Sequence, residues 1–129
     1  MRKGSLSRSL RLLTFPAATT LGLAASTIAL AADAEHGKQL FQACAACHTD
    51  RPDALGPSLK GVVGRKSATL EDFRYSNPMK RANLVWDEEN LRAYIADPQA
   101  KVPGNRMPFA GLHDPKDADD VITYLKTLK

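Results

Sequence analysis

The chain has 129 residues, and 18 Lys and Arg against 14 Asp and Glu give it a formal net charge of +4 at pH 7. This length allows one domain, and shares of 43% hydrophobic and 25% charged residues exclude a disordered chain, a collagen and a multi-span membrane protein. Two cysteines are too few for a disulfide-stapled mini-protein. The basic excess favours a polyanionic partner such as nucleic acid, unless those charges lie in a segment that is removed.

Residues 1–31 have the pattern of a cleaved secretory signal peptide. Basic residues begin the segment, no charge follows from Leu12 to Ala32, and Ala29-Leu30-Ala31 forms an Ala-x-Ala exit. We predict cleavage after Ala31, with Ala34 as the alternative. A retained membrane anchor is the competing interpretation, since the uncharged stretch is long enough to span a bilayer, but its proline, glycine and hydroxyl residues make it weakly hydrophobic.

Removal of this leader also removes the basic excess. Residues 1–31 contain four of the 18 basic residues and none of the 14 acidic ones, so residues 32–129 are formally neutral. No nucleic-acid partner is therefore expected. Association with protein partners should depend weakly on salt, unless local cations such as Lys101 and Arg106 outweigh the balanced total.

Residues 32–129 predict an all-α domain of about four helices. The first should run from about Ala34 to Cys47, with Asp33 as its N-cap. Ser76 precedes Asn77-Pro78 and caps a short helix through residue 82. No stretch alternates with period two, so strands are not expected.

The other two helices also begin at aspartates. Asp87 opens one that Pro98 ends, because proline cannot continue a helix. Asp114-Pro115 opens the last, which turns an apolar face towards the core. Residues 49–76 and 97–113 remain as long loops, and in so small a domain these need an explanation. A large apolar cofactor in the middle would supply one.

Cys44-Ala45-Ala46-Cys47-His48 is the C-x-x-C-H haem attachment pattern. Residues three apart share one helix face, so two sulfurs can meet the two vinyl groups of one porphyrin. A thioredoxin-like site needs a preceding strand, a zinc site needs a fourth ligand, and an ordinary disulfide leaves the following histidine unexplained. We therefore predict one haem c, attached covalently through Cys44 and Cys47, with His48 as an iron ligand.

Met107 is the favoured second ligand of the iron. Two prolines and Gly104 surround it in Pro103-Gly104-Asn105-Arg106-Met107-Pro108, so its thioether can be held in place without a helix or strand. Met79 lies in a short predicted helix, where a packing role is expected. His36 and His113 are expected on the surface.

A series of motifs runs from about Gly37 to the end of the chain and covers all of the predicted domain. Through these motifs the chain resembles the class I c-type cytochromes, close to mitochondrial cytochrome c and bacterial cytochrome c2. The motifs are Cys44-Ala-Ala-Cys-His48, Gly56-Pro57-x-Leu59-x-Gly61, Gly64-Arg65-Lys66, Phe73-x-Tyr75, Trp86, Tyr94, Pro103-Gly104-x-x-Met107 and Phe109-Ala110-Gly111. The resemblance implies a small cytochrome c fold, with its helices and long loops wrapped around one covalently bound haem.

The resemblance implies a role for each site residue. His48 and Met107 would be the axial ligands, and the Pro57 carbonyl would accept the second ring N–H of His48. Tyr94 would donate to the Met107 sulfur, and Asn105 would lie at the haem in a position that commonly holds Thr.

Other residues would surround the porphyrin. Arg65, Tyr75 and Trp86 would contact the propionates, and Phe109 would close the haem edge. The first and last helices would cross through a set of packed residues, namely Gly37, Phe41, Val121 and Tyr124.

Besides Asn105, two features depart from the family pattern. Met79 stands where mitochondrial relatives usually carry a polar Asn near the haem interior. The ring of lysines around the haem edge is reduced, although Lys101 and Arg106 remain.

Iron bound by His and Met has no open position, so it can change charge by one electron but cannot readily bind oxygen or peroxide. The chain is therefore not expected to be an enzyme. We predict a soluble periplasmic one-electron carrier that works between respiratory or dehydrogenase donors and a terminal oxidase or reductase. We expect a monomer, without stable membrane insertion after cleavage, that docks transiently with redox partners near Phe109. The alternatives are a dedicated haem subunit permanently bound to an exported dehydrogenase and, less favoured, a ligand-binding or peroxidatic haem protein.

Overall fold

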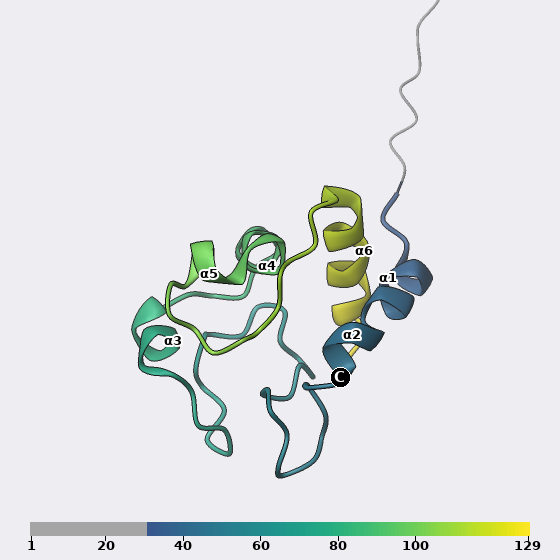
Figure 1. Ribbon diagram of the computed structural model, residues 1–129. Helices are drawn as coiled ribbons and strands as arrows, with labels where there is room; N and C mark the ends of the chain where they lie inside the picture. Colours follow the sequence, from purple (N-terminus) through teal and green to yellow (C-terminus); the bar gives the residue numbers. More distant parts are fainter. Residues whose placement is uncertain (1–30) are drawn as a thin grey trace, which may run out of the picture.

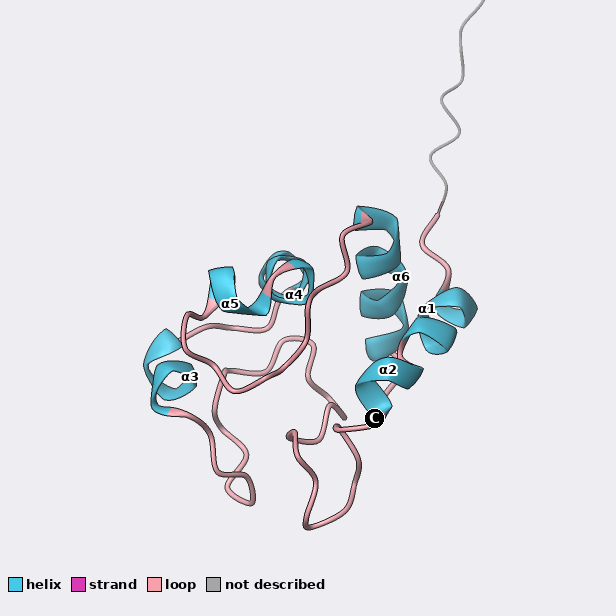
Figure 2. Ribbon diagram, viewed as in Figure 1, coloured by secondary structure: helices cyan, strands magenta, loops and turns pink. Residues whose placement is uncertain are grey.

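The computed structural model describes residues 31–129, so the predicted leader lies outside the described residues apart from Ala31. Within them the chain forms six helices (Figure 1), which are α1 (Ala34–Leu40), α2 (Gln42–Ala45), α3 (Asn77–Ala82), α4 (Glu88–Ala96), α5 (Pro98–Lys101) and α6 (Pro115–Leu125). The other described residues form loops and turns (Figure 2). Among the described residues, the one β-type pairing is an isolated antiparallel bridge between Lys66 and Val85. The predicted all-α fold is confirmed.

The four predicted N-caps are also confirmed. Each side chain accepts a hydrogen bond from a backbone N–H in the first turn of its helix, which satisfies a donor that has no partner inside the helix. The four caps are Asp33 on α1, Ser76 on α3, Asp87 on α4 and Asp114 on α6.

Two helix predictions need correction. The first predicted helix is divided at Phe41 and ends at Ala45, so Cys47 and His48 follow the helix rather than ending it. The predicted loop 97–113 contains α5, because Pro98 ends α4 and also opens a new helix. Asp97 caps α5 by accepting from the N–H groups of Gln99 and Ala100, at 3.1 and 2.9 Å.

The core lies where α1 crosses α6. Gly37 permits the crossing, because a Cβ atom there would lie 1.9 Å from the backbone oxygen of Asp120 on α6. Phe41 and Tyr124 pack next to this point, with ring centroids 5.1 Å apart. The predicted contact between the first and last helices is therefore confirmed.

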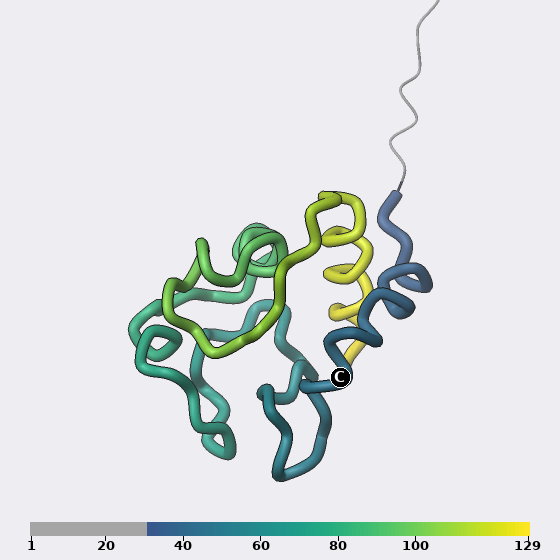
Figure 3. The backbone as a smooth tube through the Cα atoms, in the orientation of Figure 1, coloured from purple at the N-terminus to yellow at the C-terminus, as the bar shows by residue number. Residues whose placement is uncertain are grey.

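The loops occupy the side of the domain that α1 and α6 leave open. Figure 3 shows the long run after α2 turning below the helices, while the run that leads to α6 passes across the centre. Among the described residues no helix is both long and apolar enough to cross a membrane.

Candidate haem site

A cavity of about 630 Å³ lies between the loops, the end of α2, α4 and α6. This volume is in the range of sites that bind cofactors. Ten of the eleven predicted site residues line it: Cys44, Cys47, His48, Pro57, Arg65, Tyr75, Trp86, Tyr94, Asn105 and Met107. The eleventh, Phe109, is half-buried but does not line the cavity. The structure thus brings together residues that are separated by up to 63 positions in the chain, between Cys44 and Met107.

His48 is fixed on one wall of this cavity. Its Nδ1 atom lies 2.7 Å from the backbone oxygen of Pro57, as the resemblance predicts. Burial lowers the pKa of His48, although the Pro57 carbonyl acts in the opposite direction. A neutral ring that donates through Nδ1 keeps its Nε2 lone pair free for a metal.

Gly56 also lies directly against the His48 ring. A Cβ atom at this position would lie 2.6 Å from Cε1 of His48, so only glycine leaves room for the imidazole. The Gly56 N–H donates to the Cys47 carbonyl at 3.0 Å and ties this loop back to the attachment segment. The motif that contains Gly56 did not reveal this steric requirement, for which the Gly-Pro pair is the only local signal in the sequence.

The two cysteines line the cavity, are half-buried and are not joined by a disulfide. The N–H groups of Cys47 and His48 both donate to the Cys44 carbonyl, at 3.0 and 2.9 Å, so a single turn fixes all three side chains. Burial, with the nearby Cys47, raises the pKa of the Cys44 thiol. Two thiols and an imidazole next to a largely apolar cavity fit a covalently bound haem.

Met107 is held by a loop that Asn105 organises. The Met107 N–H donates to Oδ1 of Asn105 at 2.8 Å, and Nδ2 of Asn105 donates to the carbonyls of Pro98 and Val102 at 2.7 and 2.9 Å. Gly104 turns the chain with a φ of +78°. The buried Asn105 thus uses its amide on the backbone, and it positions the Met107 loop while it lines the cavity.

Aromatic side chains form another wall. The rings of Trp86 and Tyr94 lie 5.0 Å apart, and those of Phe73 and Tyr75 lie 4.9 Å apart. Burial raises the pKa of Tyr94 to about 12, so its hydroxyl stays protonated. The predicted hydrogen bond from Tyr94 to the Met107 sulfur is not among the hydrogen bonds of the described residues.

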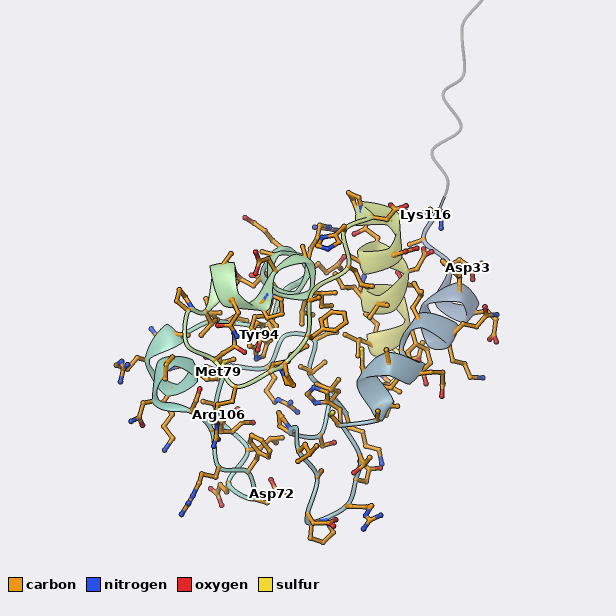
Figure 4. The ribbon with its side chains drawn as sticks, viewed as in Figure 1. Asp33, Asp72, Met79, Tyr94, Arg106 and Lys116 are labelled. Atoms are coloured by element: carbon orange, nitrogen blue, oxygen red, sulfur yellow. The ribbon has the colours of Figure 1, made fainter. Side chains whose placement is uncertain are left out.

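Arginines lie at the cavity as well. Arg65 donates to the carbonyls of Ser58 and Lys60, both at 2.8 Å, and so closes the loop after Pro57. Arg106 donates to the Arg74 carbonyl and joins two loops at the cavity wall (Figure 4). Sequence reasoning did not place Arg74 in the site, because the contact joins segments 32 residues apart.

The remaining methionine and histidines have other surroundings. Met79 packs against the core, as predicted, and also lines the cavity. His113 is exposed, as predicted. His36 is only partly a surface residue, because its Nδ1 atom lies 2.7 Å from Oδ2 of the buried Asp120.

Comparisons with known proteins agree with this site. The Cytochrome c family model matches residues 34–129. Cytochrome c2 iso-2 of Magnetospirillum molischianum is 49% identical over 100 residues, which cover 76% of this chain and 100% of that protein. Cytochrome c2 of Blastochloris viridis is 46% identical over 108 residues, which cover 81% and 85%.

A solved structure gives the same result. Cytochrome cH from Methylobacterium extorquens superposes with a TM-score of 0.70 at 45% sequence identity, and the match covers 74% of this chain and 98% of that one. The chain therefore belongs to the cytochrome c family and is a class I c-type cytochrome, an electron carrier with a haem bound covalently through its cysteines.

Proposed function

We propose that this chain is a periplasmic one-electron carrier whose iron is bound by His48 and Met107. The observation that carries the proposal is the shared cavity, in which His48 is oriented by Pro57 and Met107 is held by Asn105. A haem with these ligands supplies one-electron chemistry at a raised reduction potential. The protein's contribution is to keep both ligands in place in the two charge states.

The ligand geometry favours electron transfer over ligand binding. The hydrogen bond to Pro57 stops the His48 ring from rotating, and the bonds of Asn105 stop the Met107 loop from moving away. The largely apolar and aromatic walls of the cavity disfavour the extra charge of the ferric state. A site whose ligands move little between the ferric and ferrous states is suited to rapid electron transfer.

We also propose export and removal of residues 1–31. The basic start, apolar middle and Ala-x-Ala exit of this segment support the proposal. The family match begins at residue 34, so it leaves the leader outside the conserved domain. Covalent attachment would then give a periplasmic holoprotein made of residues 32–129.

The partners proposed are redox proteins that dock transiently and carry acidic surfaces. The formal charge of residues 32–129 is zero, but its distribution is uneven. Residues 73–86 and 98–113 contain five cations and no acid, whereas residues 33–40 and 114–125 contain six acids and two cations. None of the five cations takes part in an ion pair within the described residues; they are Arg74, Lys80, Arg81, Lys101 and Arg106.

Two of these cations lie beside the start of the loop that carries Met107. Arg81 and Lys101 line a small groove between α3 and the end of α5, which Pro78, Val102 and Pro103 also line. A few apolar groups surrounded by charge suit brief docking. The local distribution therefore favours a salt-dependent association, in which cations such as Lys101 and Arg106 outweigh the neutral total, over the weak dependence that the neutral total alone predicts.

Gel filtration and potentiometry of the exported protein test the proposed function. A free carrier elutes as a small monomer and titrates with the slope of a single one-electron couple. Persistent co-elution with an exported dehydrogenase would instead favour the dedicated subunit. Rapid carbon monoxide binding by the reduced protein would contradict both, since it requires an open position on the iron.

A further inference from the structure

The loop that carries Met107 has few backbone hydrogen bonds of its own. It runs from the end of α5 to the start of α6 (Figure 1). Within the described part of the chain, no backbone–backbone hydrogen bond involves residues 106–110. The place of Met107 in the cavity therefore depends on how the two flanks of this stretch are attached to the helices.

The flank after Met107 is attached to α4 by its backbone. The Leu112 N–H donates to the Ile95 carbonyl at 2.9 Å, and a Cβ atom on Gly111 would lie 2.0 Å from the Ala96 carbonyl oxygen. Gly111 also has a φ of +104°, which favours glycine. This flank is therefore held by a close backbone approach that no side chain contributes to.

The flank before Met107 is attached to α5 by the side chain of Gln99. Oε1 of Gln99 accepts from the Gly104 N–H at 3.2 Å, and Nε2 of Gln99 donates to the Asn105 carbonyl at 3.1 Å. Among the hydrogen bonds of residues 31–129, Gln99 is the only partner of either backbone group. One amide thus uses both its acceptor and its donor on two successive residues of the loop.

Gln99 stands on a well-anchored helix turn. α5 begins at Pro98, which is fully buried, and the Asp97 side chain accepts from the Gln99 N–H at 3.1 Å. The loop bonds back to this turn, because Nδ2 of Asn105 donates to the Pro98 carbonyl at 2.7 Å. Oδ1 of Asn105 accepts from the Met107 N–H at 2.8 Å, so the position of α5 is passed on to the methionine.

We propose that Gln99 is a positioning residue, which keeps Met107 at the cavity by holding residues 104–105 against α5. This role rests on the proposed ligand pair of His48 and Met107. Gln99 does not line the cavity, so it acts on the site only through the loop. Its side chain is exposed, and each such hydrogen bond gives a modest net stabilisation. Gln99 should therefore control how often the loop opens in the folded protein, and not whether the chain folds.

Cyanide binding by the ferric holoprotein tests this role. The proposed ligands leave the iron no open position, so cyanide can bind only after Met107 has moved away. Gln99→Leu removes both bonds at nearly the same side-chain size, and it should bind cyanide roughly tenfold faster than the parent. In urea, this variant should lose the iron–sulfur charge-transfer band well before its helical circular dichroism, because the loop opens before the helices unfold.

Gln42→Leu is the matched control. Gln42 is also exposed, and its amide donates to the Lys38 carbonyl at 3.3 Å, so this bond stays within the first two helices. Gln42→Leu makes the same chemical change without touching the loop. It should bind cyanide at the parental rate.

The possible failures are distinguishable. An unchanged cyanide rate in Gln99→Leu overturns the positioning role of Gln99 and leaves the ligand pair intact. Equal acceleration in Gln42→Leu also overturns the role, since a general loss of stability would then be the cause. A parent protein without the iron–sulfur band overturns the proposed ligand pair itself, and the role of Gln99 with it.

Discussion

Gly56 lies so close to His48 that a Cβ atom on it would come within 2.6 Å of the imidazole. This contact, and the 2.7 Å hydrogen bond from His48 to Pro57, leave the ring one orientation. The smallest residue in the site therefore has a direct effect on the proposed iron ligand.

Gly56→Ala should displace the His48 ring and weaken its bond to Pro57. We expect a loss of about 1–3 kcal/mol in the free energy of unfolding, as in other overpacked sites, together with a changed reduction potential. Urea denaturation and potentiometry of the holoprotein measure the two effects. Gly61→Ala is the control, because its Cβ would meet no atom within 4 Å and only the positive φ of 62° is strained. Equal potentials for both variants would show that Gly56 does not position His48.

Met79→Asn should lower the reduction potential by an amount on the order of tens of millivolts. Met79 lines the cavity and packs against the core, so an amide there places polarity in an apolar wall and stabilises the ferric charge. Potentiometric titration gives the shift, and Met79→Leu, which keeps the wall apolar, should change it little. An unchanged or raised potential in Met79→Asn would contradict this account of the wall.

The Asp120 cluster predicts acid sensitivity. The Lys116 ammonium, the Asp33 N–H and His36 hold the pKa of Asp120 well below its ordinary value. A depressed folded pKa stabilises the fold above the ordinary carboxyl pKa of about 4, and that stabilisation is lost as pH falls through the folded pKa. Asp120→Asn should therefore be less stable than the parent at pH 7, with the difference shrinking towards pH 2.

Urea denaturation across this range measures the effect, with Asp53→Asn as an exposed control that changes the parent curve little. Parallel pH curves for Asp120→Asn and the parent would refute the assignment.

Local charge should govern association despite the neutral total. Reversal of Arg81 and Lys101 to Glu should slow electron transfer to an acidic redox protein roughly tenfold at low ionic strength, and salt should remove most of the difference. The matched control reverses Lys38 and Lys129, which have no ion pair within the described residues and lie away from α3 and α5. Stopped-flow electron-transfer rates at several salt concentrations distinguish the two variants. Equal slowing in both would show that net charge, and not the local position of Arg81 and Lys101, governs association.

The sequence predicted features that depend on short-range chemistry. The caps of α1, α3, α4 and α6 were predictable because each bond joins residues two or three positions apart. The attachment segment was predictable for the same reason. Pro98 shows the limit of local signals, since one proline both ends α4 and opens α5.

Features that depend on distant contacts were not predictable from local pattern. The contact between Asp120 and Asp33 could not be predicted from local sequence, because 87 positions separate the two residues. The role of Asn105 in holding Met107 required the backbone of α5, a helix that the sequence analysis had assigned to a loop. Family motifs compensated for part of this, as at Pro57. The place of Phe109 at the haem edge stays a prediction, since Phe109 is half-buried but does not line the cavity.

The most direct test of the account replaces each cavity methionine in turn. Met107→Ala should abolish the iron–sulfur charge-transfer band of the ferric protein and allow cyanide to bind rapidly. Met79→Ala should keep the band and resist cyanide, since Met79 packs against the core and lines the cavity but is not the proposed ligand. A band that survives in Met107→Ala, or is lost in Met79→Ala, would contradict the proposed pair of ligands.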